Sequence, residues 1–187
     1  CGVKWVSVFP PNPARFGTQN LSAIITLSSL ENGYPVCVMD GTLCSNMRVA
    51  AIGAVAADLL AKKDVESIGF IGAGEQAKMH LLGMKSIRPN LKVCRVAAKC
   101  EEDERVFIES LQPLFPDMEF VACNTVLEHA IRDSDIIVTA TSAQAPLLKP
   151  EWITKGAFYS HIGGYGCDYK VIQMAAKHDY IIKENGK

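Results

Sequence analysis

Hydrophobic and polar positions follow two different patterns along the chain, and the change falls near residue 48. Before that point, short runs rich in β-branched residues predict strands over residues 3–9, 21–27 and 36–39. A proline-rich break at residues 10–13 follows the first run. Three such strands bury little apolar surface by themselves, so we expect this segment to need partners.

An alanine-rich stretch follows and predicts a helix over residues 46–61. Alanine is a strong helix former, and its small side chain allows close packing. We interpret this stretch as a connecting helix. The predicted organisation is a fragment of one domain over residues 1–45, the connection over 46–63 and a second domain over 64–187.

From residue 66 onward, strand and helix patterns alternate. Strands are predicted over residues 67–71, 91–97, 119–122, 135–140, 157–162 and 180–183, with helices over 75–86, 101–114, 125–132 and 171–177. This alternation is typical of parallel βαβ units with helices on both faces of the sheet. The predicted fold class is α/β, a Rossmann-type doubly wound parallel sheet with a partial, mainly β second domain.

A glycine motif lies between the first predicted strand and helix of that domain. The motif reads Gly72-Ala73-Gly74-Glu75-Gln76-Ala77 and fits G-x-G-x-x-[GA]. Gly72 would make the tight turn, Gly74 would let the backbone approach a pyrophosphate, and Ala77 would keep the helix close to the sheet. Glu75 and Gln76 begin the helix, whose N-terminus favours phosphate. The motif predicts dinucleotide binding, and a merely structural turn is the alternative.

The end of the second predicted strand is the position that reads the cofactor's ribose. NAD-binding proteins usually carry Asp or Glu there, but this chain carries Ala97-Ala98-Lys99. The absent acid at Ala98 and the nearby Lys99 favour NADP slightly over NAD. Alternatively, Lys99 is a solvated surface residue.

Polar residues and glycines end the fourth and fifth predicted strands of that domain. Ligands bind at the carboxyl ends of strands in a doubly wound sheet, so we expect Thr139, Thr141 and Ser142 beside the cofactor. Gly163 would let a nicotinamide ring lie close to the backbone. His161 either faces this site or is a hydrogen-bonded core histidine.

Composition narrows the functional classes. The chain of 187 residues is 49% hydrophobic and 21% charged, which is too apolar for a disordered protein. Its net charge of -1 argues against nucleic-acid or membrane-surface binding. The longest apolar stretch falls short of a membrane span. Seven scattered cysteines predict reduced thiols and a cytoplasmic location, with no metal site.

Four blocks resemble the ornithine cyclodeaminase/mu-crystallin family. They are Val3-Lys4-Trp5-Val6; Met39-Asp40-Gly41 with Arg48-Val49-Ala50-Ala51; Gly72-Ala73-Gly74-Glu75-Gln76; and Asp135-Ile136-Ile137-Val138-Thr139-Ala140-Thr141 with Pro146-Leu147-Leu148 and Gly163-Gly164. The resemblance implies a two-domain subunit, in which one domain binds NAD(P) and the other binds an amino or imino acid and forms a homodimer. We expect residues 1–45 to be the last N-terminal strands of that second domain.

The resemblance also implies site residues and an activity. Lys4 and Arg48 would hold the substrate carboxylate, because a guanidinium grips a carboxylate through two hydrogen bonds. The family's base would follow the Gly-Gly pair, where this chain has Tyr165, so Asp168 becomes the candidate for proton transfer. The implied activity is that of an NAD(P)-dependent oxidoreductase or deaminase acting on a small amino or imino acid. The alternative is a non-catalytic or weakly catalytic binding protein of the mu-crystallin type.

Overall fold

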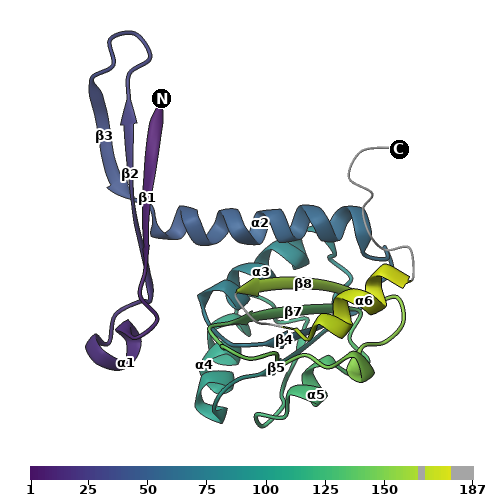
Figure 1. Ribbon diagram of the computed structural model, residues 1–187. Coiled ribbons are helices and arrows are strands. Elements are labelled where there is room, and N and C mark those ends of the chain that lie inside the picture. Colours follow the sequence, from purple (N-terminus) through teal and green to yellow (C-terminus); the bar gives the residue numbers. More distant parts are fainter. Residues whose placement is uncertain (164–166, 178–187) are drawn as a thin grey trace. The chain divides into compact units, whose positions relative to one another are not determined.

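The computed structural model describes residues 1–163 and 167–177 (Figure 1). The chain divides into two compact units, Cys1–Ala50 and Ala51–Lys187. The division falls inside the helix predicted as a connection.

The first unit is a three-stranded antiparallel sheet in the order β1-β2-β3. Its elements are β1 (Gly2–Val8), α1 (Asn12–Phe16), β2 (Leu21–Ser28) and β3 (Pro35–Asp40). Large apolar side chains stay exposed on both faces, with Trp5 and Val38 on one and Val8 and Met39 on the other. The sheet therefore buries little by itself, as its short strands predicted.

The proline-rich segment after β1 forms the short helix α1, which the sequence did not predict. Proline is tolerated in the first turn of a helix, where its missing N–H has no intrahelical acceptor. Here Pro13 occupies that turn, and Gly17 in the left-handed region (φ 63°) ends the helix.

Helix α2 (Thr42–Leu60) begins in the first unit and ends in the second. It starts four residues before its predicted start because Asp40 caps it. The Asp40 carboxylate accepts hydrogen bonds from Thr42 N (2.9 Å) and Thr42 Oγ1 (3.1 Å), and Thr42 Oγ1 accepts one from Ala23 N of β2 (3.1 Å). By length and composition alone, α2 could cross a membrane, but core helices of soluble proteins meet the same criterion.

The second unit confirms the predicted doubly wound sheet. Its strands are β4 (Ser67–Ile71), β5 (Val93–Ala97), β6 (Glu119–Ala122), β7 (Ile136–Thr141) and β8 (Phe158–Gly163). Its other elements are α3 (Glu75–Ile87), α4 (Glu101–Leu111), α5 (Leu127–Ile131), the 3-10 helix η1 (Pro150–Trp152) and α6 (Tyr169–Lys177). The strands pair in parallel in the order β6-β5-β4-β7-β8. The strand predicted over 180–183 lies outside the described residues.

Helices cover both faces of this sheet (Figure 1). One core cluster joins the sheet to α2, α3 and α4, with Leu81 and Phe107 fully buried in it. The other joins the opposite face to α5 and α6 through Ile131 and Val171. The strand order reverses between β4 and β7, so the loops that follow these two strands diverge at the carboxyl edge of the sheet. A doubly wound sheet binds ligands at this switch point.

Candidate functional site

The turn after β4 lies against the backbone of strand β7 at the switch point. Gly72 has φ +101°, a conformation that side-chain-bearing residues rarely adopt. A Cβ added to it would stand 2.3 Å from Ala140 O, so only glycine fits. Gly72 N donates to Ala97 O of β5 (2.8 Å), which fixes the turn from the other side. The first motif glycine is thus held between three strands.

The N-terminus of α3 is open beside this turn. Gly74 is the N-cap residue, and no side chain of the described residues caps it. Apart from its chain neighbours, no atom of residues 1–163 and 167–177 lies within 4 Å of where a Gly74 Cβ would stand, so these residues leave space for an anion against the backbone. Glu75 is exposed and pairs with Lys78 (3.6 Å), while Ala77 is fully buried against the sheet. Free N–H groups and the helix dipole make this end suited to a phosphate.

A second close backbone approach joins the ends of β7 and β8. Gly163 has φ +117°, and a Cβ there would stand 2.5 Å from Thr141 O. Thr141 is half-buried and its Oγ1 accepts from Ala143 N (3.3 Å), while Ser142 is exposed. Gly72, Thr141, Ser142 and Gly163 therefore lie at the carboxyl ends of the strands, and their part in binding a cofactor stays a prediction.

Thr139 lies deeper than this edge and belongs to a polar cluster. It is fully buried, with Oγ1 2.8 Å from Tyr159 Oη and 3.3 Å from His161 Nδ1. Tyr159 Oη is also 2.9 Å from His161 Nδ1. Burial raises the pKa of Tyr159 well above its usual value, so the phenol keeps its proton and can donate. His161 is hydrogen-bonded, as one of its two interpretations required, but it is exposed and not a core residue.

The residues predicted at the ribose follow β5. Ala98 is buried, and its N–H donates to Glu104 Oε1 of α4 (3.0 Å). Lys99 is exposed. Ala98 is therefore a fixed backbone position, and Lys99 is the side chain of this pair that reaches solvent.

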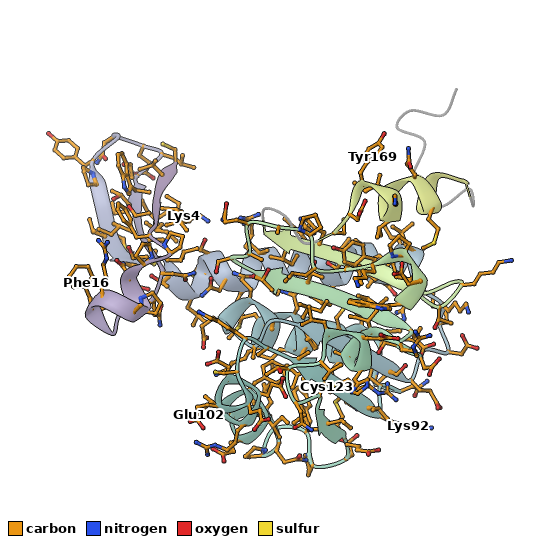
Figure 2. The ribbon with its side chains drawn as sticks, turned by 60° about the horizontal axis from the view of Figure 1, so that its bottom comes forward. Lys4, Phe16, Lys92, Glu102, Cys123 and Tyr169 are labelled. Atoms are coloured by element: carbon orange, nitrogen blue, oxygen red, sulfur yellow. The ribbon has the colours of Figure 1, made fainter. Side chains whose placement is uncertain are left out.

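The first unit holds Lys4 against the start of α2. Lys4 Nζ donates to Ser45 Oγ (3.1 Å), and Ser45 is only 4% exposed. Figure 2 shows Lys4 leaving β1 on the side of this helix. Arg48 lies three residues after Ser45 on α2 and is exposed. Sequence reasoning missed Ser45, although its i,i+3 spacing from Arg48 places both on one side of the helix.

Asp168 serves as a cap in the described structure. Its Oδ1 accepts from Lys170 N (2.9 Å) and its own N–H reaches Leu148 O (3.4 Å), at the start of α6. Tyr165, where the family's base was expected, lies among residues 164–166, outside the described residues. Over residues 1–163 and 167–177, no group of three or more His, Cys, Asp or Glu could hold a metal.

The model of the ornithine cyclodeaminase/mu-crystallin family matches residues 1–183. The chain belongs to this family. It is similar to the alanine dehydrogenase of Archaeoglobus fulgidus, with 33% identity over 175 residues that cover 89% of this chain and 49% of that protein. It is also 30% identical to the N-((2S)-2-amino-2-carboxyethyl)-L-glutamate dehydrogenase of Staphylococcus aureus, covering 86% of this chain and 48% of that protein.

A solved structure agrees with this family assignment. It is the Δ1-pyrroline-2-carboxylate reductase of Thermococcus litoralis in complex with NADH and L-proline, with a TM-score of 0.87 and 29% identity. The match covers 92% of the present chain and 54% of the reductase chain. The chain thus spans about half the length of the curated relatives it matches.

Proposed function

We propose that this chain binds a nicotinamide dinucleotide along the carboxyl edge of its parallel sheet. The observation that carries the proposal is the pair of close backbone approaches at Gly72 and Gly163, one on each side of the end of β7, together with the N-terminus of α3 that follows Gly72. A Cβ at either glycine would collide with a backbone oxygen, so glycine at both positions lets the ends of β4, β7 and β8 approach one another closely at the edge where we propose that the ligand lies. The NADH in the Thermococcus litoralis relative supports the same ligand class.

We further propose that the protein is an NAD(P)-dependent oxidoreductase or deaminase acting on a small amino or imino acid. The relatives named above support this class, since they are dehydrogenases and reductases of such compounds. When bound, the nicotinamide would supply or accept the hydride. The chain's residues would orient the two molecules: the α3 N-terminus for the pyrophosphate, and Thr141, Ser142 and Gly163 for the nicotinamide half.

The substrate's carboxylate would bind Lys4 and Arg48. Lys4 Nζ has three N–H donors, of which Ser45 accepts one, so two remain for the substrate. Arg48 is exposed and can present its guanidinium fork to a carboxylate. Asp168 is our candidate for moving the proton at the substrate nitrogen, and its cap at α6 holds the carboxyl group in a fixed direction.

The slight preference for NADP would rest on Ala98 and Lys99. An acid at the Ala98 position would repel a 2′-phosphate, and an exposed ammonium at Lys99 would attract one. The test is titration of the chain with NADH and NADPH by calorimetry, repeated for Lys99→Ala. Lys155→Ala, another exposed lysine, is the matched control. Tighter NADH binding that Lys99→Ala leaves unchanged would contradict the preference.

The activity and assembly are tested on the purified chain and, where the gene encodes more residues, on the full-length protein. We expect NAD(P)H oxidation with cyclic imino acids or with 2-oxo acids and ammonia, and a homodimer in sedimentation. Tight cofactor binding without turnover on any of these would favour the non-catalytic alternative, which the named relatives do not favour. The free, dispersed cysteines of this chain support a cytoplasmic location for the protein.

A further inference from the structure

A buried carboxylate lies beneath the predicted adenosine end of the site. Among the residues that the structure describes, Glu104 of α4 is the acidic side chain that is completely buried (0% exposed). Its Oε1 accepts hydrogen bonds from Ala98 N (3.0 Å) and Thr125 N (2.7 Å), and its Oε2 accepts one from Asn124 N (2.9 Å). Three backbone donors therefore balance the cost of removing this charge from water.

Two of these donors come from a strained turn. Asn124 (φ 51°) and Thr125 (φ 63°), just after β6, both adopt the left-handed conformation, which costs a side-chain-bearing residue about 1 kcal/mol or more. This geometry points their successive N–H groups the same way, as in the backbone nests that bind anions. Here the protein's own carboxylate fills the nest, so the strain serves the contact with Glu104.

The third donor connects Glu104 to the cofactor's expected place. Ala98 follows β5 directly, which is the position that reads the adenosine ribose in a dinucleotide domain. Because the Ala98 N–H is committed to Glu104, it is not available to the ligand. A 2′-phosphate would then need other donors, of which the Lys99 side chain is adjacent and exposed.

We propose that Glu104 is a positioning residue for the adenosine half of the dinucleotide, because it locks the loop after β5 to the turn after β6. This inference rests on the proposed cofactor binding. The carboxylate touches no ligand itself. It fixes the surface on which the adenosine ribose would lie, and it decides which groups of that surface remain available to hydrogen-bond the ribose or its phosphate.

The test compares Glu104→Gln with Asp103→Asn, its exposed neighbour in the same turn. A glutamine keeps the shape, but its NH₂ group faces a backbone N–H and removes a charge-assisted bond. We expect calorimetric dissociation constants for NADH and for ADP-ribose to rise together by about tenfold. The control should leave both unchanged. A merely structural role would lower the thermal midpoint or the bound fraction and leave the dissociation constants as they are.

A second variant separates the two halves of the site. Gly163→Ala alters the nicotinamide end, so it should weaken NADH binding while ADP-ribose binding stays unchanged. If Glu104→Gln does not fold, amide NMR of the unaltered chain decides: ADP-ribose should shift the Ala98, Asn124 and Thr125 resonances, and unshifted resonances overturn the inference. Equal affinities in the unaltered chain and folded Glu104→Gln overturn it too. If the unaltered chain binds neither NADH nor ADP-ribose, the proposed function itself fails.

Discussion

Arg88 fastens the end of α2 to the end of α3 inside the second unit. Its guanidinium is 4% exposed and donates to the carbonyl oxygens of Ala57 (2.9 Å), Asp58 (3.1 Å), Ala61 (3.4 Å) and Lys62 (3.2 Å). The last carbonyls of a helix have no intrahelical donors, and the helix dipole favours a cation there. The Arg88 side chain thus donates hydrogen bonds to four carbonyl oxygens at the C-terminal end of α2 and just after it.

Replacing Arg88 with methionine keeps the buried stem and removes every donor. The bonds to Ala57 O and Ala61 O are buried, and hydrogen bonds from a charged donor contribute about 1.5–3 kcal/mol each. Ala57 O retains its bond from Ala61 N (2.9 Å), and the Ala61 O contact is long, so we expect a total loss of about 3 kcal/mol. For a domain of this size that lowers the thermal midpoint by about 10 °C.

The loss of unfolding free energy is measured by urea and thermal unfolding, with Trp152 fluorescence as the signal. The Trp5→Phe background removes the other tryptophan, so only the second unit contributes to the signal. Lys63→Ala is the control, because Lys63 pairs with the same Asp58 carboxylate (2.9 Å) but is 74% exposed. Exposed ion pairs contribute little, so the control should stay within experimental error. Equal losses in the two variants would refute the view that buried carbonyl contacts, and not the ion pair, carry the effect.

Three further predictions test the site and the fold. Gly72→Ala should lower the thermal midpoint and weaken NADH binding in calorimetry, because the added Cβ would stand 2.3 Å from Ala140 O and force the turn after β4 away from β7. An unchanged midpoint together with an unchanged affinity would contradict this close approach. Ser45→Ala should raise KM for the amino or imino acid several-fold and leave NADH affinity unchanged, since Lys4 loses its acceptor; an unchanged KM would count against this role. Burial lowers the pKa of His80 in the folded protein below its usual 6.5. As the pH drops below 6.5, His80 therefore takes up its proton in the unfolded chain before it does so in the folded chain, and the free energy of unfolding should fall. Urea titrations at pH 5 and 7.5 should show that the free energy of unfolding changes less with pH in His80→Gln than in the unaltered chain. An equal change in both proteins would contradict this role of His80.

Much of the second unit could be predicted from the sequence because its signals are local. The apolar run of β7 predicts a strand buried on both faces, and the four-residue β6 has the predicted bounds. The first residue of a helix is harder to predict where a capping side chain determines it. Helix α2 starts at Thr42 because Asp40 accepts its N–H, and the alanine pattern that predicted the helix does not extend so far.

In the candidate site too, some residues could be predicted from local sequence signals and others could not. Gly72 and Gly163 could be predicted because backbone conformation and close approach leave a glycine in the sequence. Ser45 and Glu104 could not, because their partners are 41 residues away in one case and up to 21 residues away in the other. Only the folded chain brings the donor and acceptor together. Thr139 was predicted from its strand end, but it lies two residues before Thr141 on the same face of β7, where it is fully buried and hydrogen-bonded to Tyr159.

The close backbone approaches at Gly72 and Gly163 carry an evolutionary consequence. A close approach of main chain to main chain constrains these glycine positions and does not depend on the side chains of loops farther away. Substitutions in neighbouring loops can then alter which small molecule is accepted without rebuilding the part that would hold the dinucleotide. Such a separation lets one scaffold diversify in chemistry, while any side chain at either glycine would bring a Cβ within 2.5 Å of a backbone oxygen.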